Sequence, residues 1–301
     1  MPTFCVYDII NLRRIKMKLL RGIFKAVISL ALLLVMLTAG IYIFVRAKYG
    51  IDLWNTVGQL KTISKSVDES EVCPDAFVAG DYTSMQTVVN ASVDGLVGGD
   101  EEAGFTISFD TLPSEMTSII SLTDKQVGAL ADVVIKKYVN SKITIAGKDI
   151  AIVLKQIKFD TDENGVTAFN TVVRLDMTPF KKEMNKFPLK YLKKYVPQYM
   201  YVSSTVNVTK DTTAFSYHIE HNALAINKLS ADKTEDLFKT LDKVLKIGDA
   251  ETLNKKIGNI VVGSLVGSES QTGLAYSLKP IGATDYAFTK VGGVNNFVIN
   301  K

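Results

Sequence analysis

The stretch "DIAIVLKQIKFDTDENGVTAFNTVVRLDM", residues 149–177, holds two runs rich in Val, Ile, Phe and Thr on either side of a polar turn. In the second run, Phe169, Val173, Leu175 and Met177 alternate with polar residues. Successive side chains of a strand point to opposite faces, so this alternation predicts a strand with one apolar face and one face in water. The short polar link predicts that the two strands are antiparallel neighbours.

Similar runs on both sides of this hairpin predict a larger antiparallel sheet. Helical spacing appears within residues 123–139, where Thr123 and Gln126 match the T-x-x-Q capping box that begins many helices. The order of helix, long strands, paired helices and final strands predicts an α+β fold in which the sheet curls around apolar helices. Other strands are expected at 105–109, 143–145, 200–209 and 213–226 and near Leu274, Tyr286 and Phe297, and later helices within 237–245 and 253–265.

The region before these strands has a different pattern. Apolar residues within 51–67 recur at spacings of three and four, which predicts one seam of a helix. A second helix is expected over 81–96, and the glycine-rich segment 97–104 predicts a loop, where we place the main domain boundary. The expected organisation is a basic N-terminus at 1–25, a transmembrane helix at 26–45, a helical stalk and linker at 46–104, and an extracytoplasmic α+β domain at 105–301.

The segment 26–45, "AVISLALLLVMLTAGIYIFV", contains no charged residue. A helix of this length, at about 1.5 Å per residue, spans the roughly 30 Å hydrocarbon core of a bilayer. Lys and Arg residues concentrate before it, so the positive-inside rule predicts a cytoplasmic N-terminus and an external C-terminal domain. A cleaved signal peptide ending at Ala39 is the alternative, but the apolar run continues to Val45. The expected location is therefore the cell membrane, with a single pass.

Composition is consistent with a folded external domain. The 301 residues are 47% hydrophobic, which is enough for one large or two small folded domains. Cys5 and Cys73 fall on opposite sides of the expected span, so they cannot pair with each other. Met17, which opens "MKLLRG", is an alternative start to Met1.

The segment 180–201, "FKKEMNKFPLKYLKKYVPQYMY", combines six lysines and six aromatic rings with one acidic residue. Lysines attract anions and rings supply apolar area, so the segment predicts contact with an anionic surface. An external location removes nucleic acid as a partner and leaves membrane lipid, through its anionic headgroups, or envelope polymers. A solvated surface face is the alternative. The candidate surface residues are Lys186, Phe187, Lys190, Tyr191, Lys193, Lys194 and Tyr195.

Three stretches carry a family resemblance: "ISLTDKQVGALADVVIKKYV" at 120–139, "ITIAGKDIAIVLKQIKF" at 143–159 and "FSYHIEHNALAINKLSADKTEDLFKTL" at 215–241. Together they resemble bacterial envelope proteins with a tubular lipid-binding, TULIP-like fold. The resemblance implies that the chain binds a lipid or a lipid-linked envelope precursor in an apolar groove between sheet and helix, and it implies no catalytic residues. The groove-lining candidates are Val127, Leu130, Val134, Phe169, Val173 and Leu175.

Enzyme chemistry has few candidates in this chain. His218 and His221 lie three apart on an expected strand, so they should face opposite ways and could not share a metal without a bulge. Ser230 and Lys233 match S-x-x-K without its companion motifs, and a helix cap explains Ser230 more simply. We therefore expect a non-enzymatic protein without a cofactor. A structural or signalling ectodomain with an unknown protein partner is the main alternative, and a hydrolase the weaker one.

The turn "DTDENG" at 160–165 resembles the first half of a calcium loop. Asp160, Asp162 and Asn164 occupy ligand positions one, three and five, but position twelve is Thr171 instead of glutamate. A hairpin turn requires Asp, Asn and Gly for its own backbone geometry. We therefore interpret the segment as a turn and expect no metal.

Overall fold

A computed structural model describes residues 46–47, 50, 52–145, 148–183, 193–245 and 248–301. The chain divides into two compact units, residues 1–57 and 58–301. In the first unit the Asp52 carboxylate accepts hydrogen bonds from the backbone N–H groups of Trp54 and Asn55, at 3.0 and 3.1 Å, and so caps the start of a helix. No helix in the described residues is long and apolar enough to cross a bilayer, and the apolar run at 26–45 lies outside them.

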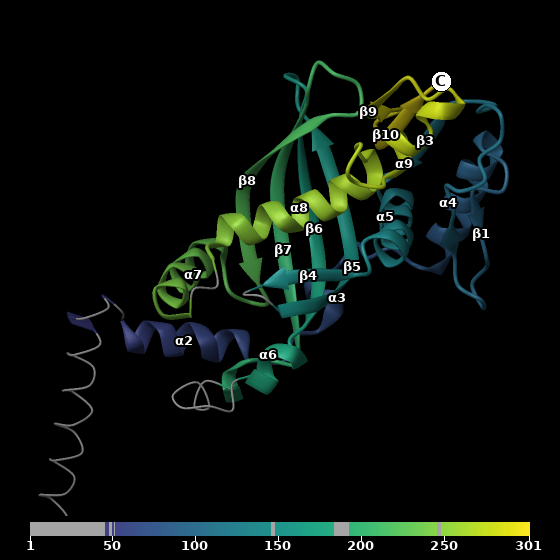
Figure 1. Cartoon of the computed structure of the whole chain (residues 1–301). Helices are drawn as coiled ribbons and strands as arrows, with labels where there is room; N and C mark the ends of the chain where they lie inside the picture. Colours follow the sequence, from purple (N-terminus) through teal and green to yellow (C-terminus); the bar gives the residue numbers. More distant parts are fainter. Residues whose placement is uncertain (1–45, 48–49, 51, 146–147, 184–192, 246–247) are drawn as a thin grey trace, which may run out of the picture. The chain divides into compact units, whose positions relative to one another are not determined.

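The larger unit is built on a five-stranded antiparallel sheet that curls into a half-barrel (Figure 1). Each strand pairs with the next one along the chain, which confirms the antiparallel hairpin expected at 149–177. The strands are β4 (Lys142–Ile145), β5 (Lys148–Thr161), β6 (Val166–Asp176), β7 (Tyr199–Lys210) and β8 (Tyr217–Ile226).

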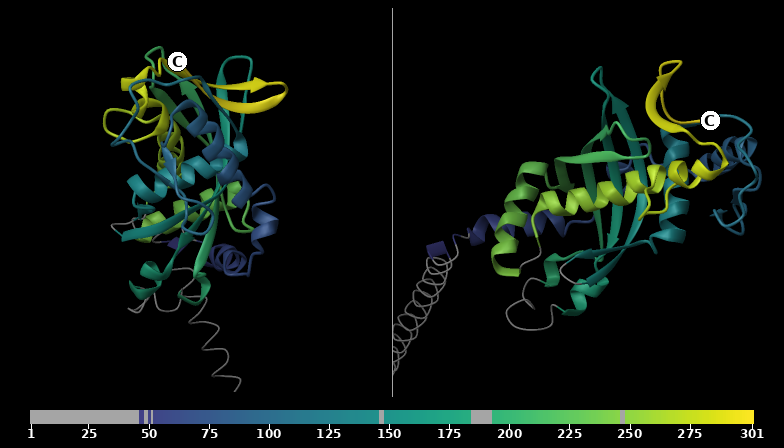
Figure 2. Two further views of the ribbon diagram at one scale, coloured as in Figure 1. Left: turned by 90° about the vertical axis from the view of Figure 1, so that its right-hand side faces the viewer. Right: turned by 45° about the horizontal axis from the view of Figure 1, so that its top comes forward.

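Helices pack against this sheet and form the other half of the core. Helix α8, the longest of the described helices, runs along one face of the sheet (Figure 2), and its apolar residues Ile257, Val261 and Leu265 are fully buried. The helices of the described chain are α2 (Leu53–Ile63), α3 (Glu69–Val72), α4 (Ala79–Ser92), α5 (Asp124–Tyr138), α6 (Thr178–Glu183), α7 (Ala231–Leu245), α8 (Ala250–Val266) and α9 (Leu274–Ser277), with short 3-10 turns η2 (Lys193–Tyr195) and η3 (Lys279–Ile281).

A second, three-stranded antiparallel sheet joins the C-terminal strands β9 (Asp285–Val291) and β10 (Val294–Asn300) to β3 (Ile120–Thr123). Aromatic rings connect it to the half-barrel. The ring of Phe288 lies 4.9 Å from that of Phe169 on β6 and 5.0 Å from that of Phe297 on β10, centroid to centroid. The two sheets therefore share one aromatic core.

Two bulges keep the apolar residues of the half-barrel on its inner face. On β5 the buried residues Ile152 and Leu154 are followed after three positions by Ile157, and Lys155 is the extra residue in the pairing with β6. On β8, Asn222 is the extra residue in the pairing with β7. Side chains along a strand alternate between its two faces, and one extra residue shifts this alternation by one position. Apolar residues that are an odd number of positions apart, on either side of the bulge, can therefore both point to the inner face.

Local signals explain how α5 begins. The backbone N–H of Thr123 donates to Oε1 of Gln126 at 2.9 Å, which confirms the expected capping box. The segment near Leu274, expected to be a strand, is instead the short helix α9. Leu274 and Leu278 are buried on the same side of this turn, and the Leu278 N–H donates to the Leu274 carbonyl. The backbone of this segment is therefore satisfied by hydrogen bonds within a helical turn and not by pairing with another strand.

Other element boundaries differ from the sequence prediction. Helix α2 ends at Ile63 and so does not reach residue 67, and α4 ends at Ser92, where Val93 turns to extended backbone. The expected strand at 105–109 shrinks to β2 (Thr106–Ile107), which pairs with β1 (Val97–Gly98). The compact unit begins at Gly58, earlier than the loop at 97–104 where the sequence suggests a boundary.

Candidate functional site

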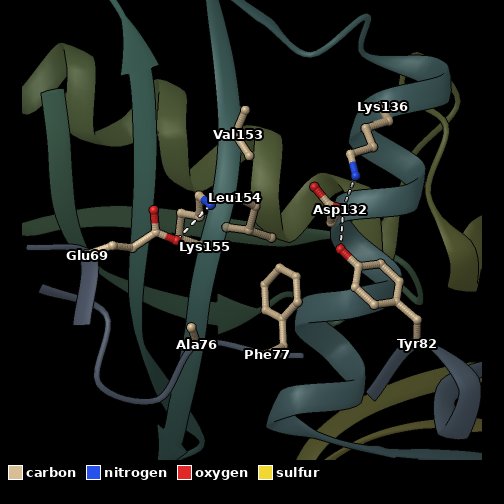
Figure 3. Close-up of a pocket in the computed structure, with 9 residues that line it drawn as sticks. All are labelled: Glu69, Ala76, Phe77, Tyr82, Asp132, Lys136, Val153, Leu154 and Lys155. Carbon is tan, nitrogen blue, oxygen red and sulfur yellow. Dashed lines mark hydrogen bonds and ion pairs between the residues drawn. The ribbon is translucent and has the colours of Figure 1, made fainter. Parts of the chain in front are cut away.

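A pocket of about 210 Å³ lies between α3 and the loop that follows it, helices α4 and α5, and strand β5. Figure 3 shows a Glu69–Lys155 pair on one side of the pocket and a Tyr82–Asp132–Lys136 group on the other. Apolar side chains form the wall between these groups. The lining residues are Glu69, Ala76, Phe77, Tyr82, Asp132, Lys136, Val153, Leu154 and Lys155.

Asp132 is the most deeply buried charged residue of this pocket. It lies on the buried face of α5 and is only 2% exposed. Tyr82 donates its hydroxyl to Oδ2 of Asp132 at 2.6 Å, and Lys136, one turn later on α5, contacts the same oxygen at 2.6 Å. Within the described part of the chain both contacts fall on Oδ2, so Oδ1 remains available as an acceptor.

The tyrosine of this group stays protonated. Burial raises the pKa of Tyr82 well above its ordinary value, and the charge of Asp132 and the hydrogen bond to it raise it further. A protonated hydroxyl is the form that donates to the carboxylate. Tyr82 is therefore the donor in its contact with Asp132 at neutral pH.

The opposite side of the pocket is anchored by Glu69. Its Oε1 lies 2.7 Å from Nζ of Lys155, and its Oε2 accepts the hydroxyl of Tyr201 at 2.8 Å. Burial opposes ionisation of Glu69, but the hydrogen bonds from Lys155 and Tyr201 outweigh it and lower the pKa. Lys155 is the extra residue of the β5 bulge, so the bulge that maintains the core also directs this lysine to the pocket.

The floor of the pocket is held by the segment between α3 and α4. The N–H of Asp75 donates to Oε1 of Gln156 at 3.0 Å, and the Asp75 carboxylate pairs with Lys158 at 2.6 Å. Phe77 packs over α5 where Gly128 has no side chain, since a Cβ there would lie 2.5 Å from the Phe77 ring. Burial raises the pKa of the nearby Cys73 thiol to about 11, so this cysteine stays protonated and inert.

Two positive and two negative side chains face this small space, together with aromatic and aliphatic walls. Such a set can hold a polar molecule by hydrogen bonds and ion pairs without transferring net charge into the protein. Within the described residues, no cluster of three or more His, Cys, Asp or Glu side chains could bind a metal ion.

The six groove-lining candidates occupy a different place. Val127, Leu130 and Val134 on α5, and Phe169, Val173 and Leu175 on β6, are all 0% exposed and belong to the same core cluster. The structure thus brings together the residues that the sequence grouped, as closely packed core and separate from the pocket in Figure 3.

Part of the basic segment is described. Lys193, Lys194 and Tyr195 form η2, where the Lys194 ammonium lies 4.9 Å from the centre of the Tyr195 ring. Tyr195 packs against the core. The remaining candidates, Lys186, Phe187, Lys190 and Tyr191, lie outside the described residues.

The calcium-like segment forms the β5–β6 turn. Oδ1 of Asp162 accepts hydrogen bonds from the N–H groups of Asn164 and Val166, both at 2.9 Å. Asp160 pairs with Lys290 of β9 at 2.8 Å, and Gly165 adopts a positive φ of 79°. These side chains stabilise a hairpin, as the turn interpretation expects.

The two histidines lie on opposite faces of β8. His218 is exposed, whereas His221 points inward, where its Nδ1 lies 2.7 Å from the Asn254 amide nitrogen on α8. The oxygen of the Asn254 amide accepts from Ser204 on β7. This network ties the sheet to α8, and a structural role accounts for its buried polar atoms.

Sequence reasoning missed Asp132, Tyr82 and Lys155. One signal was present: Asp132 interrupts the apolar face of "ALADVV", and a charge at such a position needs a partner. A second was the change of phase in the apolar positions of β5 at Lys155. Neither signal predicts which residues contact Asp132 and Lys155 in the folded protein. Comparisons with protein-family models, curated proteins and solved structures find no match for this chain.

Proposed function

We propose that this chain is a membrane-anchored, extracytoplasmic, non-catalytic protein that binds a lipid or a lipid-linked envelope component. The observation that supports the proposal best is the half-barrel sheet curled along α8. A curled sheet facing a helix encloses a long apolar layer, which is the arrangement an acyl chain requires. The same architecture is expected from the resemblance to TULIP-like envelope proteins.

The apolar layer is closed in this state. The six groove candidates are fully buried, so an acyl chain would enter only if α5 or α8 moved away from the sheet. Helices that slide or swing on a sheet are a common way for a closed core to admit a ligand. The uncharged run at 26–45 and the lysines of 180–201 support a location beside a membrane.

Lipid binding is tested on the full-length chain purified in an uncharged detergent. Extraction followed by mass spectrometry should find co-purified lipid near one molecule per chain, and a fluorescent fatty-acyl probe should bind saturably. Negligible lipid together with no probe uptake would exclude the proposal.

Contact with the membrane surface is tested separately. Changing Lys190, Lys193 and Lys194 together to Gln should weaken co-sedimentation with anionic vesicles and reduce its salt dependence, because each lysine near the surface contributes about 1 kcal/mol. A control variant with the same charge change, Lys233, Lys239 and Lys243 to Gln on α7, should bind like the parent. Equal loss in both variants would indicate an effect of net charge alone.

The closed core also favours a second candidate, an ectodomain that binds a protein partner without any lipid. A filled interior is what such a scaffold needs, since its function lies on its surface. Failure of both lipid experiments would support this candidate.

A further inference from the structure

We infer that the pocket bounded by Glu69, Tyr82, Asp132 and Lys155 binds a small zwitterion, an ammonium group beside a phosphate or carboxylate. This chemistry is that of an aminophospholipid head group or of a free amino acid. The inference deepens the proposed function and rests on it for the lipid as source of the ligand.

Unused hydrogen-bonding capacity lies on both sides of the pocket. Within the described residues, Oδ1 of Asp132 accepts no hydrogen bond, although this carboxylate is almost fully buried. Lys155 uses one ammonium donor on Glu69, which leaves two for a ligand. The buried anion of Asp132 suits an ammonium group, and the spare donors of Lys155 suit a phosphate or carboxylate.

Charge balance favours a zwitterion over a simple ion. Glu69 and Asp132 carry two negative charges, and Lys136 and Lys155 carry two positive charges, so the lining is neutral in total. A ligand with one net charge would leave an uncompensated charge in this partly dry space, which is costly. A zwitterion adds no net charge, because its ammonium group pairs with Asp132 and its anionic group pairs with Lys155.

The size of the pocket limits the ligand to a small group. Its volume of about 210 Å³ is below the roughly 300–1,000 Å³ of pockets that enclose drug-sized molecules. An acyl chain would therefore have to lie elsewhere. The walls of Phe77 and Leu154 suit the short methylene link that separates the two charges of such a head group.

The test uses the full-length chain in an uncharged detergent and isothermal titration with four probes. Glycerophosphoethanolamine, a phosphodiester with one negative and one positive charge, represents the head group, and L-alanine represents the free amino acid. Ethanolamine and inorganic phosphate each carry only one of the two charged groups. At least one zwitterion should bind saturably, and each half-ligand should bind at least about tenfold more weakly, because it loses a charge-assisted contact. Phosphate binding as tightly as glycerophosphoethanolamine would overturn the inference, as would no saturable binding of either zwitterion.

Three variants connect the binding to this pocket. Lys155→Gln and Asp132→Asn should each weaken binding at least about tenfold, and Ala76→Leu should block it by filling the space without a change of charge. Lys125→Gln is the control with the same change of charge, since Lys125 is exposed in the first turn of α5 and does not line the pocket. If Asp132→Asn fails to fold, the other two variants decide, and parent-like binding by both would overturn the inference.

The outcomes separate this inference from the proposed function. Binding of glycerophosphoethanolamine or L-alanine without any co-purified lipid would support the pocket and exclude lipid as the source of its ligand. Co-purified lipid whose amount is unchanged by Lys155→Gln and Ala76→Leu, with no zwitterion binding, would support the proposed function and overturn the inference. If the protein binds vesicles that contain phosphatidylethanolamine more tightly than it binds L-alanine, the site is assigned to a lipid head group.

Discussion

Tyr82 and Lys136 both contact the buried carboxylate of Asp132. Deleting one oxygen atom, the hydroxyl of Tyr82, removes the first of these contacts. Tyr82→Phe deletes the hydroxyl that donates to Asp132 at 2.6 Å and leaves the ring packing against Phe77 and Phe105. We expect the free energy of unfolding to fall by about 1.5–3 kcal/mol, because a hydrogen bond to a buried charge is lost.

Urea denaturation measures this change. Tyr199→Phe is the control, since Tyr199 is exposed and its hydroxyl accepts a long contact of 3.4 Å from Gln198, while its ring keeps the Arg174 contact. This variant should stay within about 0.5 kcal/mol of the parent. Equal effects of the two substitutions would mean that the Asp132 contact adds nothing to stability.

Glu69 links stability to pH. Its pKa is lowered in the folded protein, so its contribution is fully present above its ordinary pKa of 4.5 and is lost as the pH falls through the folded value. Glu69→Gln should therefore be less stable than the parent at about pH 7, and the difference should shrink at about pH 3. Urea denaturation at both pH values tests this, with Glu163→Gln in the exposed β5–β6 turn as the control. A difference that grows in acid would contradict the assignment.

Two helical glycines have opposite surroundings, so the same substitution should have opposite effects. A Cβ at Gly58 of α2 would meet no atom within 4 Å, whereas one at Gly128 of α5 would lie 2.5 Å from Phe77. Gly58→Ala should stabilise the protein by about 0.5–1 kcal/mol through helix propensity. Gly128→Ala should destabilise it by about 1–3 kcal/mol, because the wall of the pocket must move.

Thermal or urea denaturation of both variants measures these effects. Stabilisation by Gly128→Ala would show that Phe77 moves freely and that α5 does not position the pocket wall. The comparison of the two variants therefore tests whether α5 holds Phe77 in the wall of the pocket.

The compact unit of residues 58–301 combines helical and strand regions in one core. Helix α4 buries Met85 and Val89 in the same cluster as Leu130 of α5 and Phe169 of β6. A fragment of residues 58–301 should therefore unfold in one cooperative transition, and a fragment of residues 105–301 should not, because it leaves the α4 side of α5 exposed.

Far-ultraviolet and near-ultraviolet circular dichroism in urea would follow both fragments, the second reporting on tyrosine packing. Coincident single transitions are expected for residues 58–301. A cooperative transition of residues 105–301 at the same midpoint would instead support a domain boundary at 97–104.

Local patterns were enough to predict much of the fold. Alternation of apolar and polar residues predicted the long strands β5 to β8, and the Thr123–Gln126 box predicted where α5 begins. These features depend on neighbours along the chain, which is why a sequence can reveal them. The buried set on α5 and β6 followed from the same periodicity, because it marks the face that leaves water.

Long-range pairing decided the rest. Asp132 and Tyr82 are 50 residues apart, and Glu69 and Tyr201 are 132 apart, so their contacts exist only after the sheet and helices have packed. The segment near Leu274 looked like a strand because its apolar residues have no distinctive period over so short a length. The sequence alone thus determined which segments are strands or helices and which faces are apolar. The tertiary structure determined the pocket, because the charges that line it come from parts of the chain that the fold alone brings together.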